Sequence, residues 1–267
     1  MNQQRIITPK LSSKLNGQTR LSHLDGMKIF LSILVVMHHS ALAYTIHETW
    51  PIRETQLTSA LKPFISVNAT FFMGAFFFIA GILAPSSFAK LGFKSFIFSK
   101  AKRLLLPAVL LALIAKPFLR FLFNQKIDSA HLLHDYLYNF DFVHGWFLIQ
   151  LFFYCFTYGL LKKTLSNVKF PFEKIYAYVL VMLSLAGITT LINIFSPINT
   201  WFFAHTIEPY HFPQYIILFF MGVLYADYGK TLNTATLLLC SLTSIFLMAL
   251  YIINFTFHIF PSCFEHL

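Results

Sequence analysis

Charged residues are scarce in this sequence of 267 residues, in which only 11% are Asp, Glu, Lys or Arg. Soluble globular domains carry about 25% charged residues, so an ordinary soluble fold is not expected. The three cysteines do not suggest a disulfide framework, because Cys155 and Cys240 lie within apolar runs. The chain also lacks a glycine-rich phosphate loop and a Gly-x-Ser-x-Gly nucleophile elbow, which argues against the nucleotide-binding and hydrolase classes that use them.

Long apolar runs take the place of charge, since 57% of the residues are hydrophobic and 33 are Phe. Seven runs, helped by aromatic and basic residues at their ends, are suited to cross a hydrocarbon core of about 30 Å. They cover approximately residues 29–44, 63–84, 104–115 with a continuation to 123, 146–161, 175–195, 213–225 and 234–257. We therefore predict an all-α fold, a polytopic transmembrane helical bundle with about seven spans.

The placement of charge predicts the orientation of this bundle. With a cytoplasmic N-terminus, the inner segments 1–28, 85–103, 162–174 and 226–233 hold fifteen basic and three acidic residues, and the outer segments hold five basic and seven acidic. This is the positive-inside pattern, and it predicts a multi-pass protein of the bacterial inner membrane. The net charge of +10 is spread over four segments, so we expect anionic lipid and not nucleic acid as its partner.

The domain organisation expected from the sequence is simple. Residues 1–20 are polar, basic and without helical periodicity, so they are predicted to form a disordered cytoplasmic tail. The remaining residues, 21–267, are predicted to form one membrane domain, because the loops between the apolar runs are too short for a soluble domain.

Two adjacent histidines, His38 and His39, lie in the second half of the first apolar run. An ionisable side chain inside a span is costly, so its presence favours a functional role. Lys28 precedes His39 by eleven residues, or three helical turns, which places both on one helix face about 16 Å apart. A neutral imidazole can take a proton from a hydroxyl near pH 7. His39 is therefore a candidate base, while a packing histidine that hydrogen-bonds between helices is the alternative, and His38 faces elsewhere.

The segment Leu24-Asp25-Gly26-Met27-Lys28, followed by the run ending in His39, resembles the first helix of the acyltransferase-3 family of membrane O-acyltransferases. That family has a basic residue, usually Arg, ten intervening residues and a histidine; Lys28 keeps the charge but not the planar fork of Arg. Further stretches resemble the family in the same order, namely 71–81 (FFMGAFFFIAG), 96–107 (FIFSKAKRLLLP), 144–148 (HGWFL) and 212–222 (FPQYIILFFMG). The resemblance covers about residues 21–230.

The resemblance implies a reaction, which is the transfer of an acetyl or succinyl group from acyl-CoA to a hydroxyl of an envelope carbohydrate or related acceptor. Such an enzyme is an acyltransferase that transfers groups other than aminoacyl groups, with acyl-CoA as co-substrate and no bound cofactor. Lys28, Lys100 and Arg103 are implied to bind the donor, because two cations three residues apart share a helix face and attract phosphates. Ordinary positive-inside charge also explains Lys100 and Arg103. His39 and His144 are implied to be catalytic, although His144 also suits an interfacial position beside Trp146.

Other interpretations stay open at this point. A transporter with a histidine proton relay would explain His38 and His39, but the broken spans expected in its two halves are not seen. Members of the family commonly have more helices than the seven expected here, so an inactive truncated member is a third alternative. His131 and His134 could share a helical face, but no Cys or Glu completes a zinc-binding spacing, so no metal is expected.

Overall fold

The structure, a computed structural model, describes residues 9–45, 57–115, 142, 145–171, 174–196 and 200–228. The regular elements within these ranges are helices, and the only bridged residues there are Phe202 and Ile207. The predicted all-α class is therefore confirmed for this part of the chain. One helical stretch in it, Lys62–Ile114, is long and apolar enough to cross a membrane by length and composition. The seven spans and the cytoplasmic N-terminus stay predictions.

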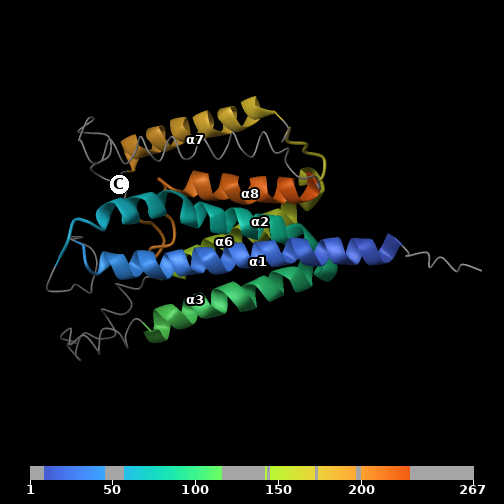
Figure 1. Cartoon of the computed structure of the whole chain (residues 1–267), viewed down its shortest axis with the longest axis horizontal. Helices are drawn as coiled ribbons and strands as arrows, with labels where there is room; N and C mark the ends of the chain where they lie inside the picture. The colour runs from blue at the N-terminus through green and yellow to red at the C-terminus, as the bar shows by residue number, and fades with distance from the viewer. Residues whose placement is uncertain are drawn as a thin grey trace, which may run out of the picture. The chain divides into compact units, whose positions relative to one another are not determined.

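The helices follow the predicted apolar runs and extend beyond several of them (Figure 1). They are α1 (Pro9–Leu42), α2 (Lys62–Lys100), the π-helix η1 (Ala101–Leu105), α3 (Leu106–Leu110), the π-helix η2 (Leu111–Ala115), α6 (Trp146–Leu165), α7 (Ile175–Phe195) and α8 (Phe212–Tyr228). The run 175–195 matches α7 at both ends. The run 234–257 and the continuation of the third run to 123 lie outside the described residues.

Helix α1 begins at Pro9, so residues 9–20 are helical where the sequence analysis predicts a disordered tail. Once a helix has nucleated, each added residue gains a backbone hydrogen bond, and Lys and Leu are good helix formers. A helix can therefore extend through polar sequence without the apolar periodicity on which the prediction of a tail depended. Residues 1–8 lie outside the described part of the chain.

Gly92 interrupts α2 with backbone angles that are not helical, φ 68° and ψ 171°. Such a positive φ favours glycine, because a side chain would clash with the backbone there. In Figure 1, α3 runs back in the direction opposite to the part of α2 that precedes Gly92. The charged segment 85–103, expected between two spans, is therefore helical on both sides of a turn at Gly92.

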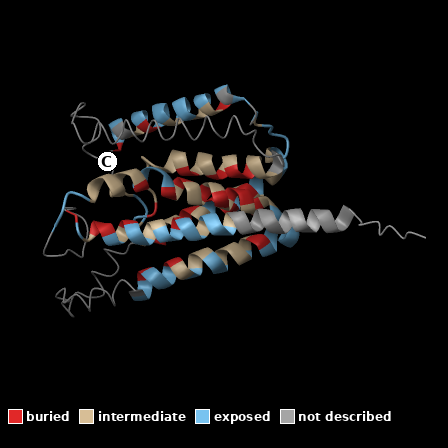
Figure 2. Cartoon of the chain, in the orientation of Figure 1, coloured by how far each residue is buried: buried red, intermediate tan, exposed pale blue. Residues whose placement is uncertain are grey.

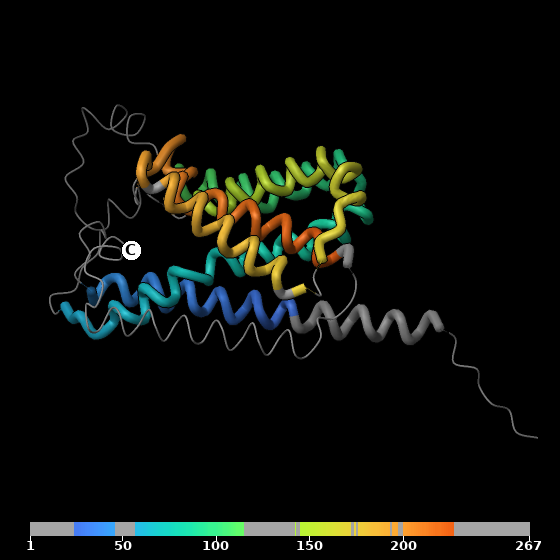
Figure 3. Tube along the Cα trace, turned by 90° about the horizontal axis from the view of Figure 1, so that it is seen from above, coloured from blue at the N-terminus to red at the C-terminus, as the bar shows by residue number. Residues whose placement is uncertain are grey.

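Two compact units make up the chain, Met1–Ile79 and Ala80–Leu267. In the first unit, α1 and the beginning of α2 run side by side in opposite directions (Figures 1 and 3). The Asn68 amide donates a hydrogen bond to the Leu34 carbonyl at 3.1 Å, and the Thr58 N–H donates to the Tyr44 carbonyl at 2.8 Å. Polar contacts near both the middle and the end of α1 therefore hold this helix pair together.

In the second unit, Gly81 lets α2 approach α8 closely. A Cβ placed on Gly81 would lie 2.0 Å from the carbonyl oxygen of Phe219 and 3.2 Å from the Cα of Gly222. Phe219 and Val223 are fully buried in the part of α8 that contacts α2. Small residues are typical of interfaces between membrane helices because they allow the backbones to pack together.

Helix α7 exposes apolar side chains along most of its length (Figure 2). The exposed large residues are Tyr176, Val179, Leu180, Met182, Leu183, Ile188, Leu191, Ile194 and Phe195. Figures 1 and 3 both show α7 beside α8, where the Gln214 amide donates to the Thr189 hydroxyl at 3.2 Å. A contiguous exposed apolar surface is rare on soluble monomers and is expected where a helix meets lipid.

Candidate functional site

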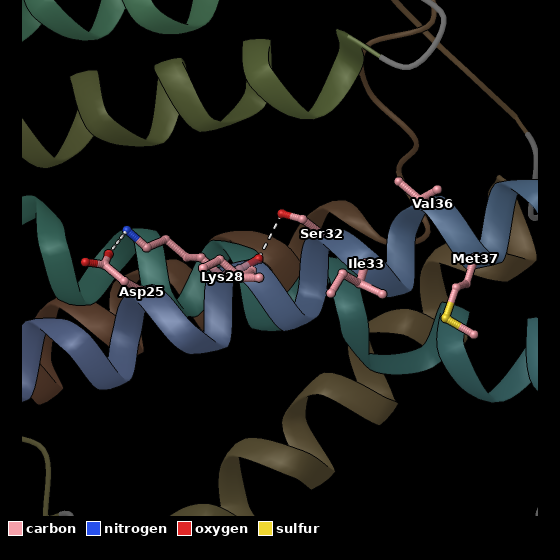
Figure 4. Close-up of a pocket in the computed structure, with 7 residues that line it drawn as sticks. Asp25, Lys28, Ser32, Ile33, Val36 and Met37 are labelled. Atoms are coloured by element: carbon pink, nitrogen blue, oxygen red, sulfur yellow. Dashed lines mark hydrogen bonds and ion pairs between the residues drawn. The ribbon is translucent and has the colours of Figure 1, made fainter.

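The first predicted site residues lie on α1, in the unit Met1–Ile79. An open groove of about 670 Å³ follows one face of this helix (Figure 4). It is lined by Asp25, Lys28, Ile29, Ser32, Ile33, Val36 and Met37. These positions recur at helical spacing, and three further residues lead from Val36 to His39. Lys28 lines this groove, whereas His39 is not among its lining residues. That Lys28 and His39 share one stripe of α1 stays a prediction from helical spacing.

Lys28 forms an ion pair in this groove. Its ammonium lies 2.5 Å from a carboxylate oxygen of Asp25, and the two side chains are 41% and 61% exposed. Figure 4 shows this pair and the hydrogen bond from the Ser32 hydroxyl to the Lys28 carbonyl, which is 2.8 Å long. Water screens an exposed ion pair strongly, so Asp25 holds the ammonium only weakly. Lys28 is thus able to exchange Asp25 for an anionic ligand.

His38 and His39 have different surroundings at the C-terminal end of α1. His38 is buried, and its ring centroid lies 5.1 Å from that of Phe72 on α2. His39 is half-buried, and its ring stands nearly perpendicular to the His38 ring at 5.4 Å. The structure therefore gives His38 a packing contact and leaves His39 the more accessible of the two. Asn68, which is buried, went unnoticed in the sequence analysis, although it is an amide within the second apolar run.

Lys100 belongs to a second group, at one end of the unit Ala80–Leu267. Its ammonium lies 5.4 Å from the ring centroid of Phe96, and the Lys162 ammonium of α6 lies 5.7 Å from that of Tyr158. Both rings are fully buried, with centroids 6.3 Å apart. We call Phe96, Lys100, Tyr158 and Lys162 the basic-aromatic cluster. The sequence analysis did not single out Lys162. The feature that could have pointed to it is the pair of adjacent lysines, Lys162 and Lys163, at the end of the fourth apolar run.

Arg103 lies on η1 and is exposed. A π-helix hydrogen-bonds to the fifth residue along, so its turn is wider and each residue rotates by less than in an α-helix. Lys100 and Arg103 therefore diverge more than the α-helical spacing assumed in the sequence analysis. Single π-helical turns occur frequently at functional sites. The position of Arg103 on such a turn is therefore consistent with a functional role.

A third group gathers aromatic side chains around the N-terminal ends of α6 and α8. The Trp146 ring stacks on Tyr215 at 5.8 Å and meets the edge of Trp201 at 5.6 Å. Trp201 in turn stacks on His205 at 4.2 Å, with only 13° between the ring planes. Continuous ring contacts therefore join α6, the segment before α8, and α8 itself.

A carboxylate and an imidazole lie beside these rings. Glu208 is only 7% exposed, and its carboxylate lies 3.7 Å from the Nε2 atom of His211. The His211 ring stacks on Tyr215 at 5.7 Å. Burial lowers the pKa of His211, and this outweighs the opposing effects of the Glu208 charge and a hydrogen bond with Gln214. The imidazole therefore favours its neutral form. We call Trp146, Trp201, His205, Glu208, His211 and Tyr215 the aromatic-acid cluster.

The sequence analysis did not predict the aromatic-acid cluster. Its signal is faint, because Glu208 is a lone acidic residue in a short polar segment and Gln150 is one amide in an apolar run. Gln150 is buried and donates to the Thr206 carbonyl at 2.7 Å, while the Tyr154 hydroxyl donates to Gln150 at 3.0 Å. Only packing shows that this amide fixes the segment that carries the cluster.

His144 lies outside the described residues, and so do His131 and His134. The described neighbour Gly145 donates its N–H to the Phe142 carbonyl at 2.7 Å, immediately before α6. Within the described ranges, no three His, Cys, Asp or Glu side chains are grouped so that they could hold a metal ion. Each unit contains predicted site residues, with Lys28 and His39 in the first, and Lys100 and Arg103 in the second.

Comparison with known proteins identifies a family. The family model described as an acyltransferase domain, Acyl_transf_3, matches residues 21–264. No curated protein and no solved structure matches the chain. The matched range contains all five residues that the sequence analysis predicts for the site, namely Lys28, His39, Lys100, Arg103 and His144.

Proposed function

The chain belongs to the acyltransferase-3 family, and from this membership we propose that it is a membrane O-acyltransferase. In this proposal it moves an acyl group, acetyl or succinyl, from acyl-CoA to a hydroxyl of an envelope carbohydrate or related acceptor. The observation that carries the proposal is the family match over residues 21–264, which includes nearly all of the membrane domain. Such a transfer needs cations for the donor phosphates and a base for the hydroxyl.

Donor binding is assigned to cations on the predicted cytoplasmic side, namely Lys28 within α1, Lys100 and Arg103 where α2 passes into η1, and Lys162 in the last turn of α6. Lys100 and Lys162 are held beside buried aromatic rings, which favours a defined position for each ammonium. Arg103 is exposed on the wider turn of η1 and can present its planar fork to a phosphate. Lys28 contributes a further cation. Water weakens its exposed ion pair with Asp25, so the ammonium is able to bind a donor phosphate instead.

His39 serves as the base in this scheme. Its neutral imidazole takes the proton of the acceptor hydroxyl while the oxygen forms a bond to the thioester carbonyl carbon. Collapse of the tetrahedral intermediate breaks the carbon–sulfur bond, and the departing thiolate takes the proton back from the imidazolium. The products are the acyl ester and free CoA, and His39 returns to its neutral state. Its half-buried position supports this role, because partial exclusion of water strengthens electrostatic interactions in the transition state.

The proposed location is the bacterial inner membrane, with several spans and a cytoplasmic N-terminus. The basic residues of the inner segments support this orientation. It brings Lys28, Lys100, Arg103 and Lys162 to the side where acyl-CoA is made. The acceptor would then be reached from within the membrane domain or from its outer side.

The direct test is transfer of a radiolabel. Purified protein is incubated with acetyl-CoA or succinyl-CoA labelled in the acyl group and with an envelope extract, and the carbohydrate fraction is then counted. We expect label that mild alkali releases, since this lability distinguishes an ester from an amide. Heat-denatured protein is the control. Folded protein that transfers no label from either donor would contradict the proposal.

A further inference from the structure

The aromatic-acid cluster has no role in the scheme above, although it combines features that a ligand site needs. Glu208 is a carboxylate that is 7% exposed, and His211 lies 3.7 Å from it. The carboxylate and the neutral imidazole are both hydrogen-bond acceptors, so the pair offers two polar groups to one ligand.

The rings around this pair favour one class of ligand. The exposed His205 ring stacks flat on Trp201, and Trp146 stacks on Tyr215. A pyranose has a face of C–H bonds that suits the electron-rich face of an aromatic ring, and hydroxyls at its rim that donate to carboxylates. The outer face of the exposed His205 ring, in the same cluster as a carboxylate and a neutral imidazole, thus suits a sugar with an apolar face and polar hydroxyls.

The backbone that carries these groups is held in an uncommon conformation. Phe203, Ala204 and His205 have φ angles of 52°, 54° and 62° in succession. Residues other than glycine rarely adopt the left-handed region, and such strain concentrates at functional sites. Gln150 holds the segment through the Thr206 carbonyl, and the Phe142 N–H donates to the Ala204 carbonyl at 3.1 Å. These two hydrogen bonds, to the residues on either side of His205, hold the turn that carries it.

We propose that the aromatic-acid cluster is the binding site for a carbohydrate acceptor. Glu208 and His211 accept hydrogen bonds from sugar hydroxyls, and the exposed His205 ring, supported from behind by Trp201, contacts the face of the sugar ring. This inference rests on the proposed O-acyltransferase function and adds to it the location of the acceptor.

The position of the cluster suits that role. Trp146 and Lys162 lie sixteen residues apart on α6, which corresponds to about 24 Å along the helix. The donor phosphates and the acceptor therefore bind at opposite ends of one helix. The pantetheine arm of acyl-CoA carries the thioester away from its phosphates, so the thioester need not lie where the phosphates bind.

Tryptophan fluorescence measures this binding directly, because two of the three tryptophans, Trp146 and Trp201, belong to the cluster. A Trp50→Phe background removes the third. The protein is kept in nanodiscs, since maltoside detergents carry sugar headgroups. The probes are the methyl glycosides of glucose, galactose and N-acetylglucosamine. A linear trisaccharide built from each of these sugars is also used. We expect a saturable fluorescence change with at least one probe.

Variants then test the residues. Glu208→Gln should raise the dissociation constant of that probe about ten- to a hundredfold, as expected for loss of hydrogen bonds to a charged group. His205→Ala should also weaken binding, and its exposed position keeps the test valid if Glu208→Gln fails to fold. Phe203→Ala is the matched control, because Phe203 lies on the same turn and is 77% exposed. Its dissociation constant should be unchanged.

The outcomes separate this inference from the proposed function. Absence of a saturable change with every probe, or binding that neither Glu208→Gln nor His205→Ala weakens, overturns the acceptor site. Acyl transfer to carbohydrate without sugar binding at the cluster overturns this inference alone. Sugar binding that depends on Glu208, in a protein that transfers no acyl group, overturns the O-acyltransferase function and supports the cluster as a sugar site.

Discussion

His38 and His39 are one residue apart, yet their surroundings differ because each step along an α-helix rotates the side chain by about 100°. His38 is buried against Phe72, whereas His39 is half-buried. The sequence analysis predicted from helical geometry only that the two side chains point in different directions. It could not show that Phe72 is the neighbour of His38, since that contact joins two different helices.

Replacing His39 by Gln tests the proposed base. Glutamine keeps hydrogen-bonding capacity but cannot accept a proton near pH 7, so turnover should fall by about two to four orders of magnitude. The initial rate of label transfer from acetyl-CoA measures the effect, with expression and insertion checked by immunoblot. A purely packing role makes the opposite forecast, in which His39→Gln keeps wild-type turnover.

Replacing Lys100 and Arg103 together by Ala tests donor binding. Loss of charge-assisted phosphate contacts should raise the apparent KM for acyl-CoA by at least about tenfold, because such contacts contribute about 1.5 to 3 kcal/mol each. The double variant Lys90→Ala with Lys94→Ala is the matched control, since these exposed lysines lie in the same basic segment. If KM changed equally in both double variants, donor binding by Lys100 and Arg103 would be refuted. The two residues would then serve only as positive-inside charge that sets the topology.

At the level of elements, the sequence analysis identified helices more reliably than it identified their ends. The apolar run 175–195 coincides with α7, because a run flanked by polar residues fixes both ends of a span. Helix α1 extends to Pro9 through polar residues, and η1 interrupts the regular helix after Lys100. Apolar periodicity carries no information about such extensions or about π-helical turns, which depend on local packing.

The contact between α2 and α8 leads to a prediction about stability. Gly81→Ala places a Cβ 2.0 Å from the carbonyl oxygen of Phe219, so the helices must separate. We expect a loss of about 1 to 3 kcal/mol of stability, as for other overpacked interiors. Thermal unfolding followed by size-exclusion chromatography in detergent measures this loss as a lower midpoint temperature.

The matched control is Gly187→Ala on α7, where an added Cβ would meet no atom within 4 Å. Alanine is the better helix former, so this variant should unfold at the wild-type temperature or slightly above it. If Gly81→Ala were as stable as Gly187→Ala, close packing of α2 on α8 would be refuted.

For the whole molecule, the predicted topology is tested with reporter fusions. Fusions after Lys94 and Lys169 should fluoresce with a cytoplasmic GFP reporter, and fusions after Glu54 and Glu208 should be active with a periplasmic alkaline phosphatase reporter. The physical reason is the excess of basic residues in the inner segments, which resist translocation. Cytoplasmic fluorescence after Glu54 would contradict a cytoplasmic N-terminus followed by a first span.

The sequence by itself determined the helical class and the family, because helices are made of local hydrogen bonds and the motifs lie within single runs. It also named Lys28 and His39, which share one helix and so depend on helical spacing alone. Only the tertiary structure decided which distant residues meet, such as Phe96 with Tyr158 and Trp146 with Tyr215. Such contacts depend on how helices pack against one another, and periodicity within a helix does not encode its neighbour.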